Sequence, residues 1–208
     1  LGVVTVDDVI DVMREEATED ILKLAGTTLE ETTFPGPLRA ARLRLPGLLA
    51  AFGCSLLGVW LLARFEGVLL KALQISFFLP TVLGMAGNVA NQCAMIVVRG
   101  LATGRLGLGQ LRRIITHEVG IALLLAGVFG LASYAAVWSM GLASPELPRV
   151  VALGLFGSML LSAGIGTLLP LLLRKLRLDP AVASGPLISS SMDVLGILTY
   201  FSLAWALL

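Results

Sequence analysis

Asp193 is a single carboxylate in the interior of the last apolar segment of the chain, residues 181–208. A charged side chain at that depth in a membrane costs roughly 3 kcal/mol on insertion scales, and it is retained where it faces a water-filled path or a bound cation. The sequence therefore favours a cation-handling role for Asp193. The alternative is a carboxyl group that is neutralised or hydrogen-bonded between helices.

A second group of polar side chains lies in an earlier apolar stretch, LPTVLGMAGNVANQ at 79–92, among residues that weaken a helix. Proline removes a backbone hydrogen bond and glycine lowers helix propensity, so the pattern predicts an interrupted helix. Interrupted backbone at membrane depth is tolerated where it is buried in protein or lines a wet cavity. The amides indicate either such a cavity or a patch of interhelical hydrogen bonds. The helix-weakening residues are Pro80, Gly84 and Gly87, and the amide side chains are Asn88, Asn91 and Gln92.

The composition places these residues in a membrane protein. Of the 208 residues, 57% are hydrophobic and 14% are charged, and the mean hydropathy is +0.92, which is far outside the soluble range. Cys54 and Cys93 lie in apolar runs and are interpreted as packing residues. A single histidine, His117, argues against a zinc or iron site built from histidines. No nucleic-acid partner is expected.

Five apolar segments predict an all-α membrane protein with five transmembrane helices. A span needs ~20 apolar residues to cross a ~30 Å core, so the first segment is short by this measure. Lys and Arg gather before the first segment, between the second and third, and between the fourth and fifth. This pattern predicts a cytoplasmic N-terminus and a C-terminus outside. The segments are 46–63, 68–98, 114–140, 150–173 and 182–208.

The N-terminal segment is acidic and has a helical pattern. Residues 1–31 carry a net charge of −7 and the rest of the chain carries +8. Apolar residues at helical spacing predict an amphipathic helix over 7–25, which Gly26 ends. Residues 2–6 are strand-like, which implies a missing upstream domain. The opposite charges indicate that the helix docks on the membrane body or that a cation bridges their acids. The alternative is that the acids only keep this segment in solution.

Three stretches of the sequence resemble the MgtE family of magnesium channels and transporters, and the resemblance covers nearly the whole chain. They are TVDDVIDVMREEATEDILKL (5–24), LPTVLGMAGNVANQCAMIVVRGLATG (79–104) and LRLDPAVASGPLISSSMDVLGILTYF (176–201). The resemblance implies a dimer with five spans, a cytoplasmic connecting helix called the plug, and upstream cytoplasmic domains that include paired CBS domains. On this sequence it implies the end of a CBS domain at 1–6, the plug helix at 7–25, a linker at 26–45 and a five-span pore domain at 46–208.

The same resemblance implies which residues meet the ion. The pore aspartate of the family falls on Asp193, and the cytoplasmic aspartate of its DPA motif falls on Asp179. Two family glycines are replaced here by Ala86 and Ala90, and a family asparagine after DPA is Gly185, so the choice among divalent ions stays open. The acids of the plug fall on Asp8, Asp11, Glu16, Glu19 and Asp20.

The expected ion is hydrated Mg²⁺, which keeps several waters and is usually held by one or two carboxylates. Two copies of Asp193 across a dimer axis would supply −2, which matches one divalent ion. Asn88, the backbone carbonyls of 83–87 and the Ala183 backbone are expected to hold waters of the ion. Binding through water is loose enough to release it. The hypothesis is a Mg²⁺ channel or transporter of the inner (plasma) membrane that admits Mg²⁺ to the cytoplasm and is closed by cytoplasmic Mg²⁺.

Two other classes of protein fit part of the pattern. A proton-coupled divalent-cation transporter would use Asp193 as its proton carrier, and a flux assay with and without a pH gradient separates it from a channel. An intramembrane aspartyl protease would need Asp179 and Asp193 together, but fourteen residues span ~21 Å along a helix, so no enzyme is expected.

Glu118, at the start of the third span, is interpreted as an interfacial residue rather than a second ion-facing acid.

Overall fold

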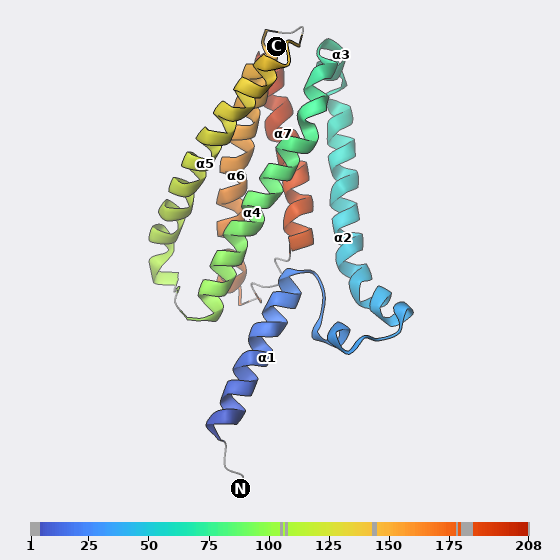
Figure 1. Ribbon diagram of the computed structural model, residues 1–208. Helices are drawn as coiled ribbons and strands as arrows, with labels where there is room; N and C mark the ends of the chain where they lie inside the picture. The colour runs from blue at the N-terminus through green and yellow to red at the C-terminus, as the bar shows by residue number, and fades with distance from the viewer. Residues whose placement is uncertain are drawn as a thin grey trace.

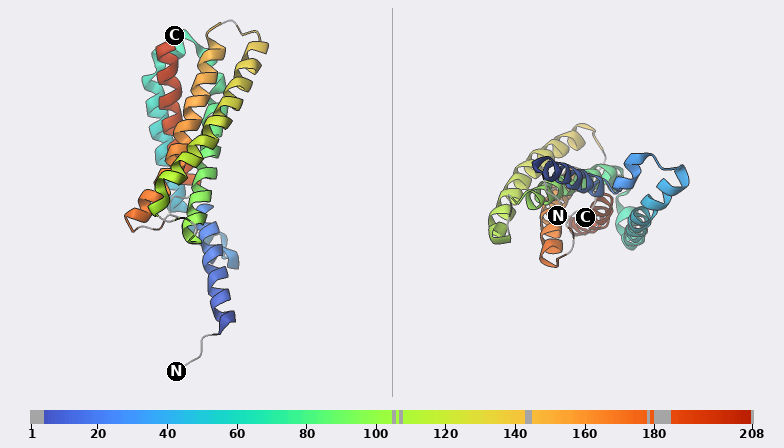
Figure 2. Two further views of the ribbon diagram at one scale, coloured as in Figure 1. Left: turned by 90° about the vertical axis from the view of Figure 1, so that its left-hand side faces the viewer. Right: turned by 90° about the horizontal axis from the view of Figure 1, so that it is seen from below.

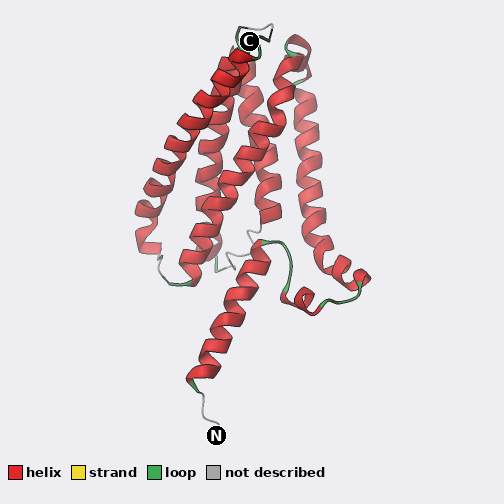
Figure 3. Ribbon diagram, viewed as in Figure 1, coloured by secondary structure: helices red, strands yellow, loops and turns green. Residues whose placement is uncertain are grey.

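The computed structural model describes residues 5–104, 106, 108–142, 145–177, 179 and 185–207, and these residues form helices joined by loops and turns, with no strand among them (Figure 3). Five helical stretches are long and apolar enough to cross a membrane. The predicted all-α fold with five spans is therefore confirmed. The stretches are Pro37–Arg64, Leu73–Ala102, Leu111–Ser139, Leu147–Lys175 and Gly185–Leu207.

One helix stands outside the bundle that the spans form. Helix α1 extends away from the bundle at the end opposite the C-terminus (Figure 1). The α-helices are α1 (Val6–Leu24), α2 (Pro37–Arg64), α3 (Glu66–Lys71), α4 (Leu79–Ala102), α5 (Leu111–Ser139), α6 (Leu147–Lys175) and α7 (Gly185–Leu207), and the 3₁₀ helices are η1 (Leu29–Thr33), η2 (Leu73–Phe78) and η3 (Leu108–Gln110).

Helix α6 is central to the bundle and packs against α4, α5 and α7. Helix α2 packs on α7 at one edge, and α5 lies at the opposite edge (Figure 2, right). Met159 of α6 and Tyr200 and Phe201 of α7 are fully buried and fill the core. Where α6 meets α4, Gly166 lies directly against the backbone of Ala90. The absence of a side chain at Gly166 lets these two helices approach closely.

Helix α1 begins at Val6, so the expectation that Val6 belongs to a strand is wrong; residues 1–4 lie outside the described residues. A capping box starts the helix. The Thr5 amide and hydroxyl both donate to Asp8 Oδ2, at 2.8 and 2.6 Å, and the Thr5 hydroxyl accepts from the Asp8 amide. This reciprocal arrangement satisfies donors that a helix start leaves without partners. Beyond the other end, Gly26 has a φ of +78°, which glycine adopts without strain.

The interruption of the second span lies earlier in the chain than the sequence predicted. Helix α4 runs without a break from Leu79 to Ala102, so the expected break at 83–87, with free carbonyls facing the ion, is wrong. Pro80 lies in the first turn of α4, where its missing N–H has no intrahelical partner to lose. The glycines that follow cost about 1 kcal/mol each in helix propensity, which packing can offset.

The actual irregular segment precedes Pro80, where α3 ends and the 3₁₀ helix η2 begins. The carbonyl of Ile75 in η2 accepts a hydrogen bond of 2.9 Å from the hydroxyl of Tyr200 on α7. Ile75 and Tyr200 are both fully buried. Gly154 of α6 leaves room for the tyrosine, because a Cβ there would meet the Tyr200 ring, with Cε2 at 2.8 Å. Tyr200 thus supplies the partner that irregular backbone needs when it is buried at membrane depth.

Replacement of Tyr200 by phenylalanine is expected to destabilise the protein by about 1–3 kcal/mol, because the Ile75 carbonyl stays buried and loses its donor. The check is thermal unfolding of the purified protein in detergent. Tyr134→Phe is the matched control, since the Tyr134 ring stacks on Trp138 and its hydroxyl makes no hydrogen bond to the described residues. Equal unfolding temperatures for the Tyr200 variant and the parent would show that this hydrogen bond does not stabilise the fold.

Candidate ion pathway and plug contacts

Asp193 lies on α7, and its side chain is half-buried within a single copy of the chain. Among the residues that the structure describes, none forms a hydrogen bond or an ion pair with this carboxylate. The structure therefore gives no support to the interpretation that Asp193 is hydrogen-bonded between helices. A carboxylate in a span with no protein partner is suited to a hydrated cation or to water.

The three amides of α4 occupy different environments. The Asn91 amide group donates a hydrogen bond of 2.8 Å to Ser189 Oγ on α7, which realises the interhelical bonding that the sequence left open. Asn91 Oδ1 is buried without a partner in the described residues. Asn88 and Gln92 are instead exposed on the surface of a single copy. The structure thus assigns Asn91 to α4–α7 packing and leaves Asn88 available to water.

The other groups expected to hold the ion's waters are backbone atoms. Ala183 lies outside the described residues. The carbonyls of 83–87 belong to the continuous helix α4, as described above. Among the groups predicted for the pore, the described part of the chain offers Asp193 and Asn88.

The last turns of α1 meet the connection between α6 and α7. Lys23 Nζ lies 2.8 Å from Asp179 Oδ2 and 2.9 Å from Glu19 Oε1, so the ammonium joins a plug acid to the predicted cytoplasmic aspartate. Hydrogen bonds to Asp179 and then to Glu19 raise the pKa of Lys23. Burial, and next the charge of Asp179, raise the pKa of Asp20. Glu19, Asp20 and Asp179 therefore form one cluster. Sequence reasoning missed Lys23, although its position four residues after Glu19 is a signal for an ion pair.

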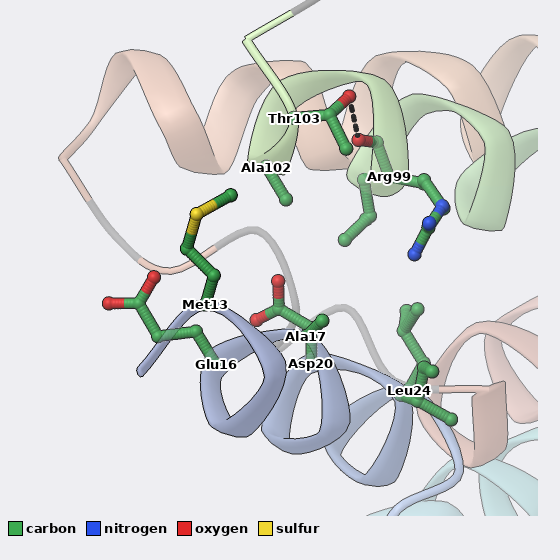
Figure 4. A pocket seen from close by; sticks show the side chains of 10 residues that line it. Met13, Glu16, Ala17, Asp20, Leu24, Arg99, Ala102 and Thr103 are labelled. Carbon is green, nitrogen blue, oxygen red and sulfur yellow. Dashed lines mark hydrogen bonds between the residues drawn. The ribbon is translucent and has the colours of Figure 1, made fainter. Parts of the chain in front are cut away.

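The remaining plug acids lie farther along α1. Glu16 and Asp20 line a cavity of about 360 Å³ between α1 and the end of α4, which Arg99 also lines (Figure 4). Figure 4 shows the Asp20 carboxylate directed toward the end of α4. Asp8 caps the start of α1, and Asp11 is exposed in the same half of the helix. The structure thus brings Glu19 and Asp20 close to Asp179, while Asp8 and Asp11 lie away from it.

Glu118 is buried against the protein, whereas its sequence neighbour His117 is exposed. Its side chain is 6% exposed, and its Oε1 lies 3.3 Å from Nδ1 of His117, whose side chain is 71% exposed. The carboxylate also contacts the thiol of Cys93 on α4. It belongs to α5, which packs chiefly on α6, so the structure does not place it in a site with Asp193. Its burial follows from helix packing, which the local sequence does not specify.

Five spans, a carboxylate in the last of them with no partner among the residues described, and an acidic helix that contacts one end of the bundle are the features of an ion-transport protein of the membrane. The comparisons with known proteins refine this class. The model of the MgtE family, described as a divalent cation transporter, matches residues 79–203.

Curated relatives extend the match over the rest of the chain. A magnesium transporter MgtE of Thermus thermophilus is 37% identical over 210 residues, covering 100% of this chain and 46% of the relative. A magnesium transporter MgtE of Bacillus subtilis is 35% identical over 208 residues, covering 99% of this chain and 46% of the relative. The chain belongs to the MgtE family, which confirms the resemblance drawn from the sequence. It spans less than half the length of these relatives.

Proposed function

We propose that the chain conducts hydrated Mg²⁺ across a bilayer and that Asp193 is the carboxylate the ion passes. The observation that carries this proposal is the half-buried Asp193 side chain, which has no partner among the described residues. The family and the names of its relatives support magnesium as the ion. Magnesium dehydrates reluctantly, so a carboxylate that contacts the ion through its water shell binds it without trapping it.

The proposed active form is a homodimer with the two copies of Asp193 near its axis. Asn88 and Gln92 expose amides from a spanning helix of a single copy, and such groups are unfavourable against lipid. A second copy would remove them from lipid and enclose a wet path that both α4 and α7 line. Two Asp193 carboxylates would then compensate the charge of one divalent ion. Cross-linking in liposomes tests this assembly, and a monomer that retains full flux would refute it.

The proposed orientation places α1 in the cytoplasm, the C-terminus outside, and the protein in the inner (plasma) membrane. Arg39 lies in the first turn of α2, Arg112 lies in the first turn of α5 and Arg174 lies in the last turn of α6. Because successive spans alternate in direction, these arginines lie at the same end of the bundle as α1. Positive residues at one end favour that end as the cytoplasmic side.

We also propose that cytoplasmic Mg²⁺ closes the path through the plug. Glu19, Asp20 and Asp179 repel one another when α1 is docked, and a divalent cation among them would remove that repulsion. Burial, and next the charge of Asp179, raise the pKa of Asp20, which supports the view that a negative charge on Asp20 is unfavourable there. A cation that binds the docked arrangement more tightly than the undocked one shifts the population toward closure.

Replacement of both Glu19 and Asp20 by alanine is expected to raise the cytoplasmic Mg²⁺ concentration needed for half-closure by about tenfold, within the usual range of coupling between sites. Patch recordings from proteoliposomes over a range of Mg²⁺ concentrations measure this value. The control replaces Asp7 and Glu15 by alanine, which removes the same charge from exposed positions of α1 that are not among the predicted ion-binding acids. An unchanged midpoint in the Glu19/Asp20 variant would exclude these residues from the sensor.

A flux assay separates the proposed channel from a proton-coupled transporter, which would use the same Asp193. Liposomes loaded with a Mg²⁺-sensitive dye are tested with and without a pH gradient at constant Mg²⁺ gradient. Equal rates of Mg²⁺ uptake with and without the pH gradient support the channel. Uptake that requires the gradient would assign Asp193 to proton coupling instead.

A further inference from the structure

Lys23 makes the ion pair that joins α1 to the membrane bundle in the described part of the chain. Its ammonium lies 2.8 Å from Asp179 in the α6–α7 connection and 2.9 Å from Glu19 one turn back on α1. The three side chains are 35–43% exposed, so the contacts are partly screened by water. No residue of α1 is buried. The side chains of α1 are at most partly buried, so this polar contact contributes directly to its docked position.

We propose that the Lys23 ammonium is a tethered cation that occupies the plug site when Mg²⁺ is absent, and that Mg²⁺ must displace it from Asp179. This inference rests on the proposed closure by Mg²⁺. Lys23 contacts two of the three carboxylates to which that closure assigns the ion. A carboxylate oxygen at hydrogen-bond distance from an ammonium cannot give that position to a Mg²⁺ ion or to its bound water at the same time.

The competition has consequences that differ at low and at high Mg²⁺. Without Mg²⁺, Lys23 stabilises the docked helix by compensating part of the charge of Glu19, Asp20 and Asp179. With Mg²⁺ bound, the ammonium is displaced and no longer contributes. Removal of the ammonium therefore weakens docking in the absence of Mg²⁺ and tightens Mg²⁺ binding to the docked state by the same factor. These two changes cancel in the free energy of the Mg²⁺-bound docked state, relative to the undocked state.

The experiment compares Lys23→Met with the parent, using the full chain in liposomes and recordings over a range of cytoplasmic Mg²⁺. The closed-to-open ratio without Mg²⁺ is expected to fall about fivefold, because the variant loses two ion pairs that are partly exposed and therefore weak. At saturating Mg²⁺ the variant and the parent are expected to coincide. Lys23→Arg, which keeps the charge, should remain closer to the parent. Hydrogen exchange of the α1 amides, which does not depend on flux, should show faster exchange in Lys23→Met only at low Mg²⁺.

Each alternative result overturns the proposal in a recognisable way. Identical ratios and exchange rates without Mg²⁺ would show that Lys23 does not hold the helix. An equal loss of docking at all Mg²⁺ concentrations would show that Lys23 stays in place when Mg²⁺ binds. If the parent carries no Mg²⁺ current, the proposed function fails, and hydrogen exchange with and without Mg²⁺ still decides the role of Lys23.

Discussion

Asp193→Asn should lower Mg²⁺ uptake by at least about a hundredfold, equivalent to about 2.7 kcal/mol at the step that limits transport. Asparagine keeps the size of the side chain and removes its charge. In the proposed dimer both charges that compensate the ion are lost together, and the other polar residue predicted for the pore, Asn88, offers only a neutral amide. The measurement is dye-reported uptake into liposomes that carry equal amounts of folded protein.

Two controls isolate the position of the charge. Asp193→Glu retains the carboxylate and should retain part of the uptake. Asp179→Asn removes a carboxylate at the end of the bundle where α1 docks, so it should leave the maximal uptake near that of the parent while changing its inhibition by Mg²⁺. Uptake at the parent rate by Asp193→Asn would place the ion path elsewhere in the protein.

Gly166→Ala should cost at least about 3 kcal/mol of stability, the upper part of the range for overpacked cores. A Cβ on Gly166 would lie only 2.8 Å from Cα of Ala90, and backbone cannot rotate away as a flexible side chain can. Helices α4 and α6 would have to separate. The unfolding temperature and the fraction of monodisperse protein in detergent measure the loss.

Gly164 provides the matched control on the same helix. A Cβ on Gly164 would meet nothing within 4 Å, so Gly164→Ala should leave stability within about 0.5 kcal/mol of the parent. If the two alanine variants unfold at the same temperature, the close approach of α4 and α6 at Gly166 does not limit the stability of the bundle.

Hydropathy predicted the spans well because each must present apolar side chains over the thickness of the membrane. The last span was expected at 182–208, and α7 covers Gly185–Leu207. The first was expected to start at Pro46, but α2 begins at Pro37 and includes Arg39, Arg42 and Arg44. A helix can continue past the hydrocarbon into water, where charged residues are tolerated, so a count of apolar residues finds the span and misses its extension.

The errors of sequence reasoning concern properties that depend on neighbours in space. Pro80 interrupts a helix or starts one according to where the preceding turn ends, and that turn is hydrogen-bonded to Tyr200, 125 residues beyond Ile75 in the sequence. Glu118 is buried on a helix whose neighbours include Cys93 of α4, far away in the sequence. Lys23 acquires its role only when the α6–α7 connection brings Asp179 to it. Asp193 could be found from the sequence because a charge within an apolar segment is a local signal.

The packing of α2 has a consequence for how the chain enters the membrane during synthesis. Among the five spans described, α2 is the first to be synthesised, yet its main partner is α7, the last of these five. It must therefore remain in the bilayer until the other four spans have been inserted. Helix α2 is suited to this delay, since it is among the most apolar spans and the least buried in protein. The spans that depend most on protein contacts, α4, α6 and α7, follow it and assemble around one another.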